Sequence, residues 1–120
     1  MTTRIAILEK NKTYRQSLLT VLKQTEGLLI DFEGDDQDAF CKSINADLSV
    51  VILVDFDLIS NKSVSLQHIK SKFPRSSIYI LSDISATAIE NLIDKKLYKG
   101  VILKSYSKND LLSGIQSILN

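Results

Sequence analysis

The sequence predicts an α/β domain in which helices cover both faces of a parallel sheet. Three observations predict this: short continuous apolar runs, amphipathic stretches that alternate with them, and short connections between the two. Continuous apolar runs are typical of strands buried on both faces. Strict alternation of strand and helix favours right-handed crossovers and a doubly wound sheet. Because no repeat or linker interrupts the pattern, we expect one domain over residues 1–120.

Five segments are predicted to form the strands. Four are continuously apolar, namely 5–8, 50–54, 78–81 and 101–103. The remaining segment, 28–32, alternates more between apolar and polar residues. It is therefore better suited to the edge of the sheet, where one face meets water.

Five amphipathic patterns are predicted to form helices. In the first, apolar residues at positions i, i+4, i+7 and i+8 end before Gly27, a natural C-terminal stop. Similar spacing marks the other four helices. The apolar residues that define all five, in chain order, are Tyr14, Leu18, Val21 and Leu22; Ala39, Phe40 and Ile44; Leu66, Ile69 and Phe73, closed by Pro74; Ile89, Leu92 and Ile93; and Leu111, Leu112, Ile115, Ile118 and Leu119.

Composition narrows the classes of function. Fifteen basic and fourteen acidic side chains give a formal net charge of +1, which argues against a dedicated nucleic-acid surface. The apolar run near the N-terminus is too short for a signal peptide, and no stretch approaches the ~20 apolar residues of a membrane span. The single cysteine, Cys41, allows no internal disulfide. We expect a cytoplasmic protein.

Chemically active side chains follow the predicted strands. Glu9 and Lys10 follow the first, Asp55 ends the run SVVILVD, Ser82 follows IYIL, and Lys104 follows GVIL. In open α/β sheets, ligands bind outside the carboxyl ends of the strands. A carboxylate directly after five apolar residues is poorly explained as a simple turn residue, and a lysine there needs a partner such as Asp55 or Glu9.

At this point the chain resembles the receiver domain of bacterial two-component response regulators. The resemblance rests on RIAILEKNKTYR, SVVILVDFD, IYILSD and GVILKSYSKNDLL, and it runs over essentially all 120 residues. It implies the flavodoxin-like fold of the chemotaxis regulators, with five helices around a five-stranded parallel sheet in the order 2-1-3-4-5. It also leaves open that the chain is the N-terminal part of a longer regulator.

The resemblance also implies roles at the site. Asp55 matches the phosphoacceptor, Ser82 the hydroxyl that binds the phosphoryl group, and Lys104 the lysine that pairs with the acceptor or with phosphoryl oxygens. Glu9 and Lys10 match the acidic pair that, with the acceptor, binds Mg²⁺. A cation is needed there because a carboxylate otherwise approaches an anionic phosphoryl group unfavourably.

Lys10 departs from this pattern, since lysine has no acceptor atom and cannot ligate Mg²⁺. Only Glu9 and Asp55 remain as metal-binding acids, and Lys10 would repel the ion. The hypothesis is that the Lys10 ammonium neutralises Asp55 and Glu9, so that Mg²⁺ binding and phosphorylation are weak or absent. The loop after Asp55 also lacks the usual Pro and Gly, and Val101 stands where a Tyr or Phe is usual.

Signal transduction through protein contacts is therefore the leading prediction, in a domain that is not itself an enzyme. The resemblance implies a histidine kinase and/or a downstream effector domain as partners. It also implies an output face, which can serve for dimerisation, on the fourth helix, fifth strand and fifth helix. The candidate residues on that face are Thr87, Asn91, Tyr98, Tyr106 and Lys108.

Two alternatives stay open. The first is a working phosphoacceptor despite Lys10, which metal-dependent labelling of Asp55 would reveal. The second is a flavodoxin-like cofactor-binding protein. The sequence offers no glycine-rich phosphate cradle after the first strand and only four glycines in all, which argues against this second reading.

Overall fold

The computed structural model describes residues 2–119 and confirms the predicted fold class. A five-stranded sheet has the order β2-β1-β3-β4-β5, and all neighbouring strands pair in parallel. The segment predicted to suit an edge, β2, lies at one edge of the sheet. The strands are β1 Thr3–Leu8, β2 Leu28–Gly34, β3 Val51–Asp55, β4 Ser77–Ser82 and β5 Gly100–Leu103.

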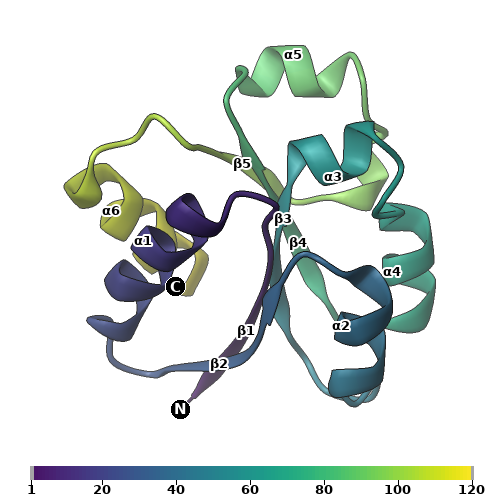
Figure 1. The fold of residues 1–120 in the computed structure, drawn as a ribbon, viewed down its shortest axis with the longest axis horizontal. Helices are drawn as coiled ribbons and strands as arrows, with labels where there is room; N and C mark the ends of the chain where they lie inside the picture. Colours follow the sequence, from purple (N-terminus) through teal and green to yellow (C-terminus); the bar gives the residue numbers. More distant parts are fainter. Residues whose placement is uncertain (1, 120) are drawn as a thin grey trace.

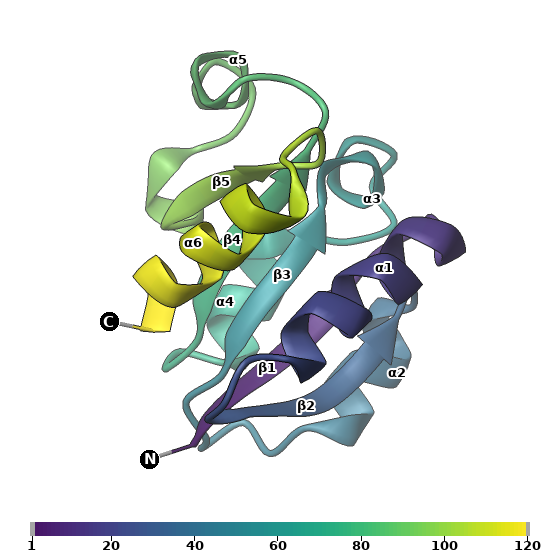
Figure 2. The same cartoon turned by 90° about the vertical axis from the view of Figure 1, so that its left-hand side faces the viewer.

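Helices cover both faces of this sheet (Figure 1). On one face lie α1 (Lys12–Lys23) and α6 (Lys108–Leu119), which face the viewer in Figure 2. The other face carries α2 (Gln37–Ser43) and α4 (Leu66–Lys72), together with shorter elements. These are α3 Phe56–Ser60, α5 Ala86–Glu90 and the 3₁₀ helix η1 Lys95–Leu97. Among residues 2–119, no helix combines the length and the apolar character that crossing a membrane requires.

The core consists of two apolar clusters, one on each face of the sheet. Successive side chains of a strand point to opposite faces, so Ala6 and Ile52 join the cluster beneath α2 and α4. Ile5 and Leu53 join the cluster beneath α1 and α6. Because both faces are covered, the inner stretches of the central strands, 5–8, 51–54 and 78–81, are apolar, which explains the continuous runs in the sequence.

One helix that the sequence pattern did not predict, α3, begins immediately after Asp55. The Asp55 side chain caps it by accepting a hydrogen bond from the backbone N–H of Asp57, at 3.1 Å. Five residues are too few to show an amphipathic period, so only the capping acid could have indicated this helix. As a result, the described chain has six α-helices instead of the five expected, plus one 3₁₀ helix.

The helix expected around Ile89, Leu92 and Ile93 is also shorter than its pattern suggested. It ends at Glu90, and Asp94 then caps η1 by accepting from the N–H of Lys96. Leu92 consequently lies outside the helix with 64% of its surface exposed. The local capping side chain therefore outweighs apolar spacing here.

Candidate functional site

The carboxyl ends of β1, β3 and β5 and the loop after β4 border a polar cleft of about 360 Å³. It lies where the strand order reverses, the position at which open α/β sheets bind ligands. Its lining residues are Glu9, Lys10, Asn11, Tyr14, Asp55, Asp57, Asp83 and Lys104.

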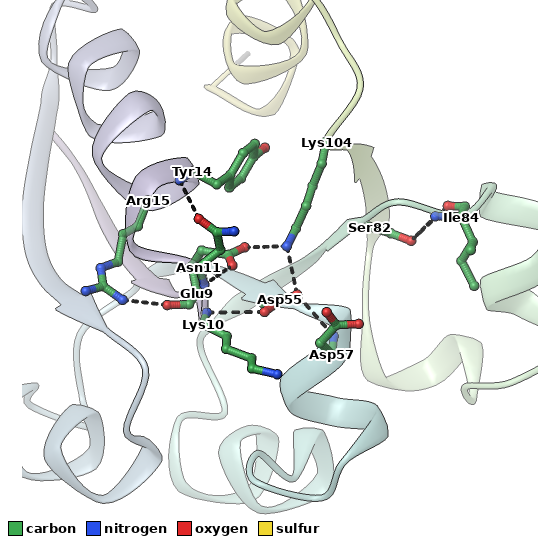
Figure 3. A network of polar contacts seen from close by, with 10 residues as sticks. All are labelled: Glu9, Lys10, Asn11, Tyr14, Arg15, Asp55, Asp57, Ser82, Ile84 and Lys104. Atoms are coloured by element: carbon green, nitrogen blue, oxygen red, sulfur yellow. Dashed lines mark hydrogen bonds and ion pairs between the residues drawn. The ribbon is translucent and has the colours of Figure 1, made fainter.

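A buried ion-pair network occupies the centre of this cleft (Figure 3). The Lys104 Nζ lies 2.8 Å from Glu9 Oε1 and 2.9 Å from Asp55 Oδ1. Glu9 and Asp55 are almost completely buried, at 0% and 1% exposure. Lys104 is the residue directly after β5, Asp55 ends β3, and Glu9 follows β1. The fold therefore brings together three side chains that are far apart in the sequence. We call Glu9, Asp55 and Lys104 the charge triad.

The remaining atoms of the Asp55 carboxylate are held by the backbone. Oδ1 also accepts from the N–H of Asp57 at 3.1 Å, and Oδ2 accepts from the N–H of Lys10 at 3.2 Å. Charge-assisted hydrogen bonds of this kind fix both the position and the rotamer of a buried carboxylate. Asp55 is therefore tied to β5, to the first turn of α3 and to the loop after β1.

Glu9 is fixed in a similar way by the turn between β1 and α1. Its Oε2 accepts from the N–H of Asn11 at 2.7 Å, and its backbone carbonyl accepts from Arg15 Nη1 at 2.6 Å. Arg15 is in turn paired with Glu33 on β2, with Nε 2.7 Å from Oε2. Asn11 caps α1, because its side chain accepts from the N–H of Tyr14 at 2.9 Å.

Burial and pairing act in opposite directions on the charges of the triad. Burial raises the pKa of Glu9 above its ordinary value, and the hydrogen bonds from Lys104 and Asn11 lower it by less. Burial would lower the pKa of Lys104, but the hydrogen bonds to Glu9 and Asp55 more than offset this, so its pKa is raised. Lys104 is consequently held as an ammonium group.

Glu9→Gln tests the raised pKa through the dependence of stability on pH. Native Glu9 keeps a proton that the unfolded chain releases near the ordinary value of 4.5, so the proton stabilises the fold at low pH. That contribution is lost as the pH rises from 4.5 through the raised native pKa. The unfolding free energy of the wild type relative to Glu9→Gln should therefore fall with rising pH, as urea titrations between about pH 4 and 8 would measure. A relative stability that increases over this range would contradict the assignment.

The position of Lys10 corrects one part of the sequence-based hypothesis. Its backbone N–H, not its ammonium group, contacts Asp55, and its exposed side chain points away from Glu9 and Lys104 in Figure 3. The cation that neutralises both acids is Lys104. A residue directly after a strand can contribute either its backbone or its side chain, and the sequence pattern alone did not distinguish the two.

Ser82 lies near the cleft but does not line it. Its hydroxyl donates to the carbonyl oxygen of Ile84 at 2.8 Å and accepts from the N–H of the same residue at 2.9 Å (Figure 3). These two bonds close the first turn of the loop after β4. Asp83, the next residue, lines the cleft instead.

The residues proposed for an output face lie on or around α5, β5 and α6. Thr87 and Asn91 are exposed at α5, and Lys108 is exposed at the start of α6. Tyr106 is 42% exposed, whereas Tyr98 is half-buried and packs against the apolar cluster beneath α2 and α4. Their role in recognition stays a prediction.

Tyr14 belongs to the site although the sequence pattern assigned it to the core. Lys104 Nζ lies 5.1 Å from the centroid of the Tyr14 ring. Burial raises the pKa of Tyr14 to about 12, against the opposing effect of the Lys104 charge. A signal for this position existed in the sequence, because an N-cap at Asn11 places Tyr14 in the first helical turn above the end of β1.

The side chains at the site do not form a typical Mg²⁺ site. Mg²⁺ needs near-octahedral oxygen ligands, usually one or two carboxylates together with waters. Here each carboxylate oxygen of Glu9 and Asp55 already lies within 3.2 Å of a nitrogen donor, and the Lys10 side chain offers no oxygen ligand. Among the residues that the structure describes, no group of three or more His, Cys, Asp or Glu side chains could hold a metal ion.

No protein-family model and no curated protein sequence matches the chain. Solved structures do match. The isolated receiver domain of RcsB from Salmonella enterica serovar Typhimurium superposes in its apo form with a TM-score of 0.79 at 21% identity, covering 98% of this chain and 88% of that one. Its form with the phosphomimetic BeF₃⁻ gives 0.78 at 20% identity, over 99% and 89% of the two chains.

A two-component response regulator of the LuxR family from Aurantimonas sp. SI85-9A1 gives a TM-score of 0.79 at 17% identity, over 99% of this chain and 86% of that one. The chain has the receiver fold. Its strand order, 2-1-3-4-5, is the one expected of that fold, and the likeness extends over 98% to 99% of the chain.

Proposed function

We propose that this chain is a receiver module of two-component signalling whose output passes through protein contacts. Asp55 stands at the phosphoacceptor position, and Mg²⁺-dependent phosphorylation of it is weak or absent. The observation that carries the proposal is Lys10: it lines the cleft beside Glu9 and offers no oxygen ligand, while Lys104 lies 2.8 and 2.9 Å from Glu9 and Asp55.

Electrostatics supports the absence of an efficient metal-dependent step. Transfer of a phosphoryl group to a carboxylate needs cationic groups that neutralise the oxygens of the transition state. Replacement of the second acid by Lys10 removes a ligand and adds a positive charge at the mouth of the cleft. Because the Lys10 side chain is exposed, solvent screens this repulsion, and the missing oxygen ligand is the larger effect.

The partners that fit this proposal are proteins. A histidine kinase and/or a downstream effector domain would bind the domain, with Thr87, Asn91, Tyr98, Tyr106 and Lys108 as candidates for the output or dimer face. The net charge of +1 does not favour a nucleic-acid partner for these 120 residues. Neither an enzymatic activity nor a flavin is part of the proposal.

Metal titration followed by NMR tests the proposal directly. Amide shifts of the wild type near Asp55 should not saturate in the millimolar range of Mg²⁺, nor change on addition of beryllofluoride, the mimic present in the RcsB structure. Lys10→Asp should produce saturable shifts at these amides, because it restores an oxygen ligand beside Asp55.

The matched control is Lys12→Asp, which makes the same change of charge at an exposed position in the first turn of α1, outside the lining of the cleft. It should remain as insensitive to Mg²⁺ as the wild type. Saturable wild-type shifts around Asp55, or Mg²⁺-dependent labelling of Asp55 by acetyl phosphate, would favour a working phosphoacceptor instead.

A further inference from the structure

The aromatic ring of Tyr14 covers the ammonium group of the charge triad. The ring stands in the first turn of α1, whose start is fixed by the hydrogen bond from the Tyr14 N–H to the Asn11 side chain, at 2.9 Å. Lys104 approaches from the end of β5, and its Nζ lies 5.1 Å from the ring centroid. In Figure 3, Tyr14 lies beside the Lys104 side chain on the side of the cleft formed by α1.

The hydrogen-bonding capacity of Lys104 explains why such a ring matters. An ammonium group has three N–H donors. One of them hydrogen-bonds to Asp55 Oδ1 at 2.9 Å, and Glu9 Oε1 lies 2.8 Å from Nζ as an ion-pair partner. Within the described residues, no third hydrogen-bond acceptor contacts Nζ. The face of an aromatic ring carries negative charge density and attracts a cation within about 6 Å of its centroid. The Tyr14 ring therefore provides the remaining favourable contact.

We propose that Tyr14 is a positioning residue that holds the Lys104 ammonium group between Glu9 and Asp55. It would act through Lys104, which its ring contacts. This inference deepens the proposed receiver function and rests on it for its biological meaning. In the domain, it would determine how readily Lys104 leaves the two acids, and hence how available Asp55 and Glu9 are to other partners.

The state of the tyrosine is consistent with this role. The phenol is neutral near pH 7, as an ordinary tyrosine is, and burial raises the pKa of Tyr14 further, to about 12. The interaction with Lys104 is thus one between a cation and a neutral ring, which depends on the ring and not on the hydroxyl group. Tyr14→Phe should preserve it, whereas Tyr14→Leu should remove it while keeping an apolar side chain in place.

Competitive trace labelling of lysines with acetic anhydride, read out peptide by peptide by mass spectrometry, tests the proposal on the intact chain. In Tyr14→Leu, the rate of labelling at Lys104 relative to exposed Lys108 should rise about fivefold, the factor expected for loss of a partly desolvated cation–π contact. In Tyr14→Phe, the ratio should stay near that of the wild type.

Lys70 serves as the internal control because its Nζ donates to the carbonyl oxygen of Ser76 at 2.6 Å, away from the cleft. Its labelling should be the same in all three proteins. Three outcomes would each overturn the proposal. These are an unchanged relative labelling rate of Lys104 in Tyr14→Leu, an equal increase of that rate in Tyr14→Leu and Tyr14→Phe, and a parallel increase in the labelling of Lys70. The assay contains neither metal nor phosphodonor, so its failure is distinct from failure of the Mg²⁺ titration.

Discussion

Lys104→Met is expected to lower the free energy of unfolding by about 3–5 kcal/mol. The substitution removes the cation between Glu9 and Asp55, which are 0% and 1% exposed, and leaves two like charges buried together. Glu9 Oε1 is the more affected atom, since it has no hydrogen-bond partner among the described residues and only the ion pair with Lys104 neutralises it. Urea unfolding at neutral pH, followed by circular dichroism, measures the change.

Lys10→Met is the matched control for this experiment. It removes the same charge from the same cleft, but the Lys10 side chain is exposed and only its backbone N–H binds Asp55. Its effect should stay within about 0.5 kcal/mol, as for most surface substitutions. If Lys10→Met cost as much as Lys104→Met, the cation of the triad would have been assigned to the wrong lysine.

The strands could be predicted from sequence for a physical reason. Both faces of the sheet are covered, so a run such as 50–54 has no polar position, as is usual in parallel sheets. The expected helices were recognisable by apolar spacing, but their ends were less so. Where Asp55 and Asp94 cap short helices, a single side chain determines the local structure, and periodicity carries no signal.

The location of the site could be predicted from the sequence, but the directions of its side chains could not. Parallel strands end at the same edge of a sheet, so Glu9, Asp55 and Lys104 had to lie near one another. The direction of each side chain depends on the backbone of the loops. That is why Lys10 contributes an amide and Ser82 bonds to its own loop, although both positions matched the pattern.

Phe40→Ala is expected to lower the free energy of unfolding by about 3–5 kcal/mol through a different mechanism. Phe40 is fully buried in the apolar cluster beneath α2 and α4, with its ring centroid 5.0 Å from that of Phe73 and 5.6 Å from that of Phe32. Truncation removes transfer free energy and leaves a cavity that the neighbouring rings fill only in part. Urea unfolding again measures the loss.

The control for Phe40→Ala is Leu92→Ala, which truncates an apolar side chain that is 64% exposed and should cost no more than about 0.5 kcal/mol.

Because Phe40 lies in the cluster that Ala6 and Leu8 enter from β1, on the opposite face from α1, its loss should destabilise the fold without disturbing the contact between Tyr14 and Lys104. Lys104 labelling well below the unfolding transition should therefore stay at the wild-type ratio. A change in that ratio would show that packing beneath α2, and not the Tyr14 ring, sets the position of the ammonium group.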